Sequence, residues 1–179
     1  MNLLKNKKNI YRILFAALVL FHLINFIIWI RRHQAYPLWD EGMHQQLILR
    51  YLNFFKTGSF NLYHFLSISD YYPPLYHLSC IPLILIMGFG PVPILLTNFL
   101  YGLIGLIFLY KTGKLLKDEE QGFWITAIFS FYFFWNFMLR ITLIDAALTS
   151  FIIISFYLFL KSDNFRDTKC TILFAVFSG

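Results

Sequence analysis

The sequence predicts an all-α membrane protein with about four transmembrane helices and the beginning of a fifth. Its 179 residues are 59% hydrophobic and only 13% charged, which is far more apolar than a soluble domain. The 22 Phe and 11 Tyr residues suit lipid-facing and interfacial surfaces. The net charge of +6 comes mostly from basic residues beside apolar runs, which indicates membrane topology rather than nucleic-acid binding.

The first predicted span covers residues 13–30, an uncharged run that is long enough to cross a bilayer. Basic residues in the tail 1–12 precede it, and Arg31 and Arg32 follow it. A cleaved signal peptide is the alternative, but the apolar run is too long and no small-residue cleavage site follows it. We therefore expect an uncleaved anchor whose tail 1–12 is cytoplasmic.

Later spans are predicted from further apolar runs, at residues 91–110, 123–144 and 145–160. A last apolar segment, residues 171–179, reaches only half-way across the hydrocarbon at about 1.5 Å per residue. We read it as the start of a fifth span and expect the chain to be the front part of a longer protein. Within the second span, Gly102 and Gly105 are expected to allow close helix packing.

The uncharged segment 71–88 has two interpretations, a further span or a helix at the outer interface. Its three prolines argue against one long helix. If it does not cross, the N-terminus and the loops 111–121 and 161–169 share one side, which then holds ten of the fifteen Lys and Arg residues. The positive-inside rule prefers this case. We therefore expect a helix over about 73–88 that lies in or dips into the outer interface.

This choice makes residues 31–90 an outer loop, and a second helix is expected within it over about 40–57. Its pattern is amphipathic, Asp40 is a good N-cap, and Gly58 is a good stop. In one interpretation Asp40 only caps the helix, and the negative charge of Glu41 interacts favourably with the positive N-terminal end of the helix dipole. In the other, one of the two carboxylates is a general base in a cleft above the membrane.

Asp145 lies between two apolar segments in LRITLIDAALTSF, where an ionisable group is costly and usually faces protein or a water-filled cavity. It could simply cap the fourth span and pair with Arg140. The predicted topology places Asp145, Arg140, Asp70, Asp40 and Glu41 together at the outer face. The same topology separates Cys80 from Cys170, so no disulfide is expected, and the five His show no metal-ligand spacing.

Three motifs follow one another in the chain: WDEGMHQQLILRYL, YYPPLYHL and LIDAALTSF. In this order and topology they resemble the polytopic glycosyltransferases of the GT-C type, particularly protein O-mannosyltransferases and aminoarabinose transferases. The resemblance implies a polyprenyl-phosphate-linked sugar donor and a hydroxyl acceptor on a protein, lipid or glycan. It also implies transfer at the outer face of a membrane, which we expect to be a bacterial plasma membrane.

The resemblance also assigns roles to the acidic residues. Asp40 matches the base that activates the acceptor, Glu41 matches a supporting residue, and Asp145 lies beside the same cavity. The leaving lipid phosphate needs cationic or hydrogen-bonding support, for which Arg140 and Arg50 are the first candidates.

Further candidate substrate-binding residues are His44, His77, Tyr72 and Tyr76. The chain departs from some relatives in having Tyr71-Tyr72 where a Glu-Lys pair precedes the prolines, which leaves the phosphate contacts open. No cofactor is predicted with certainty, and a divalent metal requirement stays open.

Two other functions remain as alternatives: a small transporter or flippase-type binding protein, and a non-catalytic membrane scaffold. A transporter should carry ionisable residues near the bilayer midplane, whereas the charges here collect at the ends of the apolar runs. A scaffold needs no convergence of Asp40 and Asp145.

Overall fold

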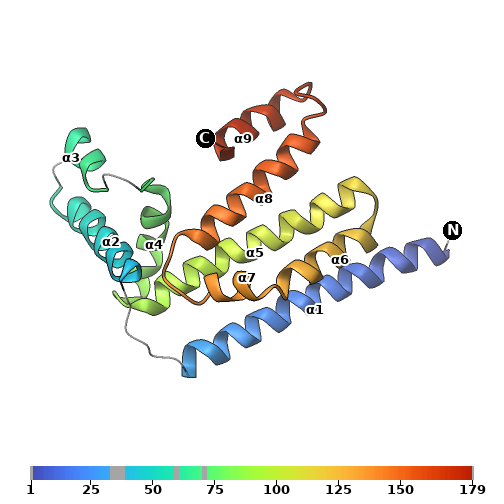
Figure 1. Cartoon of the computed structure of the whole chain (residues 1–179), viewed down its shortest axis with the longest axis horizontal. Helices are drawn as coiled ribbons and strands as arrows, with labels where there is room; N and C mark the ends of the chain where they lie inside the picture. The colour runs from blue at the N-terminus through green and yellow to red at the C-terminus, as the bar shows by residue number, and fades with distance from the viewer. Residues whose placement is uncertain (1, 33–38, 59–60, 70–71, 179) are drawn as a thin grey trace.

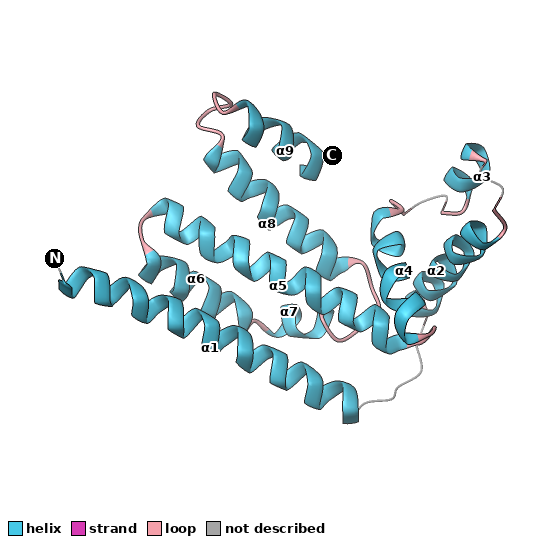
Figure 2. Cartoon of the chain, turned by 180° about the vertical axis from the view of Figure 1, so that it is seen from behind, coloured by secondary structure: helices cyan, strands magenta, loops and turns pink. Residues whose placement is uncertain are grey.

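The computed structural model describes residues 2–32, 39–58, 61–69 and 72–178, and every regular element within them is an α-helix (Figures 1 and 2). The predicted all-α class is therefore confirmed. In chain order the helices are α1 (Asn2–Arg32), α2 (Asp40–Lys56), α3 (Leu62–Ser67), α4 (Leu75–Met87), α5 (Pro91–Leu116), α6 (Glu119–Ser130), α7 (Phe133–Met138), α8 (Asp145–Lys161) and α9 (Thr168–Ser178).

Helix α5 lies at the centre, with α6 and α8 packed along it and α1 beside α6 (Figure 1). The start of α1, the α5–α6 connection and the α8–α9 connection lie at one end of the molecule, which we call the clamp end. Helices α2 and α4 and the α7–α8 loop, residues 139–144, lie at the opposite end, which we call the Asp40 end. The connections that carry the basic loops thus lie toward one end of the molecule, and their side of the membrane stays a prediction.

In the part of the chain that the structure describes, two helices are long and apolar enough to cross a membrane, Lys7–Arg32 within α1 and the whole of α5. Only 11% of the most apolar window of α1 is buried in the protein, and Ile13 and Leu20 are 68% and 54% exposed. Side chains of this kind are stable on such a surface if lipid covers them. The number of membrane crossings stays a prediction.

The segment 123–144, expected as the third span, is divided by the structure. Helix α6 ends at Ser130, α7 has only six residues, and the α7–α8 loop follows. The side-chain amide of Asn136 donates to the carbonyl of Ser130 at 2.6 Å and so satisfies a backbone acceptor at the end of α6. Helix α5 is longer than expected, since it continues to Leu116, beyond the predicted end of the second span at residue 110.

Close helix packing at Gly102 and Gly105 is confirmed. A Cβ atom at Gly105 would lie 2.8 Å from Ser150 Oγ in α8, and one at Gly102 would lie 2.5 Å from Leu139 Cδ2. Because neither glycine has a side chain, α8 and Leu139 can approach the α5 backbone directly.

A cluster of apolar side chains holds α2 and α4 against α5 and α8 at the Asp40 end. Its most deeply buried members are Ile48, Tyr51, Tyr76, Cys80, Ile94 and Ala147. The six-residue helix α3, which the sequence analysis did not anticipate, adds Phe65 beside this cluster. Both cysteines are buried and free.

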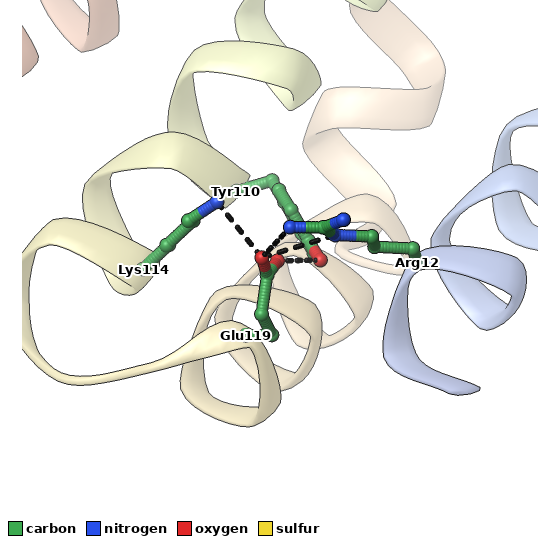
Figure 3. Close-up of polar contacts among 4 residues, drawn as sticks. All are labelled: Arg12, Tyr110, Lys114 and Glu119. Atoms are coloured by element: carbon green, nitrogen blue, oxygen red, sulfur yellow. Dashed lines mark hydrogen bonds and ion pairs between the residues drawn. The ribbon is translucent and has the colours of Figure 1, made fainter. Parts of the chain in front are cut away.

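At the clamp end, the almost fully buried carboxylate of Glu119 ties α1 to the α5–α6 hairpin (Figure 3). Glu119 Oε1 accepts from Arg12 at 2.7 Å and from Lys114 at 2.8 Å, and its other oxygen accepts from the Tyr110 hydroxyl. Burial alone would raise the pKa of Glu119, but hydrogen bonds from Lys114, Tyr110 and Arg12 lower it to about 2. Glu119 is therefore ionised and fully partnered.

Candidate active site

The acidic pair that the sequence singles out occupies the first turn of α2. Asp40 is the first helical residue and is exposed, and Glu41 beside it is partly buried. The prediction that Asp40 caps the helix is wrong, because Trp39 holds the N-cap position and no side-chain cap hydrogen bond forms there. Gly58, at φ +69°, follows the end of α2 as expected. The Asp40 carboxylate is thus not used in a helix cap.

Helix α5 holds the α7–α8 loop through the side chain of Asn98. Asn98 lies on α5 with 0% of its surface exposed. Its side-chain amide donates to the carbonyl of Ile141 at 2.6 Å and to that of Leu143 at 3.1 Å. The loop has no helical hydrogen-bond pattern of its own, so Asn98 satisfies two of its carbonyls.

Helix α2 also holds this loop, through Glu41 and Gln45. Glu41 Oε1 accepts the backbone N–H of Thr142 at 2.7 Å and lies 3.3 Å from the Thr142 hydroxyl. Gln45, one turn further along α2, donates to Thr142 Oγ1 at 3.2 Å. These contacts join segments about a hundred residues apart. They place the acidic pair beside the loop that leads into Asp145, the first residue of α8.

Asp40 and Asp145 also meet electrostatically at one side chain, His44 in α2. Burial lowers the pKa of His44, and the negative charges of Asp145 and Asp40 partly offset this effect. Neither carboxylate forms an ion pair with a residue in the described part of the chain, and Asp145 does not pair with Arg140. The carboxylates of Asp40 and Asp145 therefore both act on His44, and neither has a salt-bridge partner among the described residues.

The two predicted phosphate-binding arginines lie in different settings. Arg140 is partly buried in the α7–α8 loop, two residues before Thr142, and is within electrostatic range of His22 in α1. It forms no ion pair with any residue that the structure describes. Arg50 is exposed on α2, more than two turns beyond Glu41. Arg140 is thus the cation nearer to the loop contact of Glu41.

The predicted substrate-binding histidines form a buried pair. His44 Nδ1 and His77 Nε2 are 3.0 Å apart and join α2 to α4, and the ring of Tyr72 packs edge-on against His44. The exposed fractions of His44, His77 and Tyr76 are 2%, 0% and 1%. Of the four candidates in this group only Tyr72 has partial exposure. The buried three are placed to support α2 rather than to meet a substrate from solvent.

Burial lowers the pKa of His77 to about 4, and the neighbouring His44 contributes to the shift. Both rings are therefore neutral near pH 7, with one donating and the other accepting.

Three residues of this region were not found by sequence reasoning: Gln45, Asn98 and Thr142. A polar Asn98 within the apolar run 91–110 was the available signal, since a buried amide needs partners. One predicted member, Asp70, lies outside the described residues, and so does Tyr71, which stands where some relatives have a charged residue. Within the described residues no group of three or more His, Cys, Asp and Glu side chains is placed to hold a metal ion.

Comparison with known proteins gives one match, to a family. The sequence model of the dolichyl-phosphate-mannose-protein mannosyltransferase family matches residues 72–179, more than half of the chain. The match includes α4, α5, the α7–α8 loop and Asp145, whereas Asp40 and Glu41 precede it. No curated protein and no solved structure matches the chain.

The match agrees with the GT-C resemblance inferred from the motifs and favours an enzyme over a transporter or a scaffold. The chain therefore belongs to the dolichyl-phosphate-mannose-protein mannosyltransferase family of GT-C type glycosyltransferases.

Proposed function

We propose that the protein transfers a sugar from a polyprenyl-phosphate donor to a hydroxyl acceptor at the outer face of a bacterial plasma membrane, with Asp40 as the general base. The observation that carries this proposal is the hydrogen bond from Thr142 N–H to Glu41 Oε1. It brings the acidic pair of α2 to the loop that bears Arg140 and leads to Asp145. Family membership supports the reaction class.

The arrangement of charge supports the membrane face. The ten basic residues of the N-terminal tail and the loops 111–121 and 161–169 belong to segments that gather at the clamp end. Because positively charged loops stay in the cytoplasm, the clamp end is cytoplasmic and the Asp40 end faces outward. Charged residues also avoid the middle of α1 and α5, which suits chemistry at the membrane surface better than transport through it.

The side chains suit a single displacement. Asp40 is exposed, so it can accept the proton of a water-borne hydroxyl as that oxygen attacks the anomeric carbon. The bond between the anomeric carbon and the phosphate oxygen breaks, and the lipid phosphate leaves with an added negative charge. Arg140 stabilises this charge from the loop, with Arg50 as a more distant cation. Asp145 adds a second carboxylate near Asp40, since both act electrostatically on His44.

Asp40→Asn in the full-length protein tests the proposal. General-base help is worth about 10²- to 10⁴-fold, so sugar transfer should fall by that factor while the protein still folds. The assay supplies polyprenyl-phosphate mannose, glucose and aminoarabinose to the protein in nanodiscs and measures product by mass spectrometry. Asp163→Asn makes the same change at an exposed aspartate in the α8–α9 connection and should leave turnover unchanged.

Unchanged turnover in Asp40→Asn would remove Asp40 from the mechanism. Absence of transfer by the wild-type protein from all three donors would reject the proposed donor class.

A further inference from the structure

The carboxylate of Glu41 is directed at the backbone of the α7–α8 loop. Its Oε1 atom accepts the N–H of Thr142 at 2.7 Å, a short distance for a hydrogen bond to a carboxylate. The Thr142 hydroxyl lies 3.3 Å from the same oxygen. A general base must instead present its oxygen to a proton of the substrate. Glu41 is therefore placed to hold the loop.

Gln45 strengthens this contact from the same face of α2, because residues four apart on a helix lie one above the other. Its amide donates to Thr142 Oγ1 at 3.2 Å. Thr142 is 2% exposed and Gln45 is 9% exposed, so little water can replace these hydrogen bonds. A buried polar group left without a partner costs free energy, which favours one loop conformation.

Asn98 completes the attachment from α5. With its two hydrogen bonds to Ile141 and Leu143, three consecutive loop residues are held from two different helices. Arg140 lies directly before these three residues, and Asp145 begins α8 directly after Ile144. Movement of the loop would displace both charged side chains relative to Asp40.

We propose that Glu41, Gln45 and Asn98 are positioning residues that anchor residues 141–143 and thereby set Arg140 and Asp145 relative to Asp40. Glu41 takes no proton in the reaction. The inference rests on the proposed function for its kinetic consequence, whereas the anchoring itself can be measured without activity.

Substitutions at Glu41 distinguish its role as an anchor of the loop from a role as a general base. Glu41→Gln keeps a side-chain oxygen that can accept from Thr142, but it cannot take up a proton as a carboxylate does. Glu41→Leu keeps the approximate size and removes the acceptor. We expect Glu41→Gln to keep kcat within about tenfold of wild type. Glu41→Leu should lower kcat about 10²-fold with little change in the KM for donor, since small displacements in an active site cost this much.

Thr142 provides an independent pair of variants. Thr142→Val removes the hydroxyl that accepts from Gln45, whereas Thr142→Ser retains it, so Ser should restore most of the kcat that Val loses. Thr126→Val is the matched control, because Thr126 is also fully buried and lies on α6, away from the loop. It should leave kcat unchanged.

Hydrogen–deuterium exchange of peptides that contain residues 139–145 reads the anchoring directly, in the full-length protein in nanodiscs. Exchange should rise in Glu41→Leu and Thr142→Val but stay near wild type in Glu41→Gln, Thr142→Ser and Thr126→Val. Unchanged exchange in Glu41→Leu would overturn the anchoring. Full loss of kcat in Glu41→Gln with normal exchange would overturn the positioning role and place Glu41 in the chemistry.

The two readouts separate this inference from the proposed function. If the wild-type protein transfers no sugar, the proposed function fails, and faster loop exchange in Glu41→Leu still supports the anchor. If transfer is normal in Glu41→Leu although loop exchange has risen, the positioning role is overturned while the proposed function stands.

Discussion

The two ends of the molecule use charged residues in opposite ways. At the clamp end Glu119 is almost fully buried and accepts from Arg12, Lys114 and Tyr110, and Lys7 pairs with Glu120. At the Asp40 end, the charged side chains of Asp40, Arg140 and Asp145 form no ion pair within the described residues. The hydrogen bonds there come mainly from Gln45, Asn98, Thr142 and the two histidines.

This difference separates structural charge from charge available for chemistry. A buried carboxylate with three donors is satisfied, and its role is to hold α1 against the hairpin. Charged side chains that have no ion-pair partner among the described residues can instead interact with a substrate, a pattern that is typical of functional sites.

The largest expected contrast comes from the same substitution at both ends. Arg140→Gln should lower kcat about 10²- to 10³-fold, because it removes cationic support for the leaving phosphate. Arg12→Gln should leave kcat unchanged and lower the apparent melting temperature, since Arg12 contacts only the clamp. Transfer kinetics and thermal unfolding of both variants in nanodiscs test this. Equal kinetic losses in the two variants would contradict the division between the ends.

A smaller effect is expected from Glu119→Gln, which removes the charge at the centre of the clamp. Hydrogen bonds to charged groups contribute about 1.5 to 3 kcal/mol each, but Arg12 and Lys114 are half exposed and can return to water, so we expect a loss of about 1 to 3 kcal/mol. Thermal unfolding measures it. The neighbouring Glu120→Gln is the control and should have a weaker effect, because its partner Lys7 is exposed. An equal loss in Glu120→Gln would mean that the burial of Glu119 is unimportant.

The smallest expected effect is on the pH dependence of stability. The His77 contribution at the Asp40 end and the Glu119 contribution at the clamp end should be lost at different pH values. His77 has a pKa of about 4 in the folded protein and 6.5 as a free side chain. The unfolded state therefore binds the proton first as the pH falls, and stability is lost between 6.5 and 4. Glu119 has a lowered pKa of about 2, so its contribution is lost only below about 4.5.

Because of the histidine pair, the free energy of unfolding should be about 1 kcal/mol lower at pH 5.5 than at pH 7.5. The double variant His44→Phe/His77→Phe replaces both titratable imidazoles with phenyl rings and should show a flatter dependence of melting temperature over this range. The same slope in wild type and variant would show that other groups cause it.

Several features of the fold could be predicted because they depend on local pattern. Hydropathy indicated α1 and α5, and helix α2 was expected from its amphipathic residues and Gly58. Proximity of the acidic pair to Asp145 followed from counting basic loops. The break between α6 and α7 could not be predicted, because residues 123–139 carry no charge and are mostly apolar, and the break depends on how Asn136 turns back to Ser130.

Roles within the candidate site were harder to predict than its location. His44 and His77 were expected to meet substrate, but packing of α4 against α2 buries both rings against each other. A sequence pattern places a polar residue at the right end of a helix, yet it does not say whether a neighbouring helix covers that residue.

The sequence by itself determined the helical class, the apolar runs and the concentration of basic residues at one end, because hydropathy and charge act through each residue's own transfer between water and lipid. Only the tertiary structure decided that Glu41 holds Thr142, that Asn98 supports the same loop, and that Glu119 is paired while Asp40 forms no ion pair with any residue that the structure describes. These contacts join residues far apart in the chain, and a hydrogen bond requires donor and acceptor within about 3 Å, which packing alone provides.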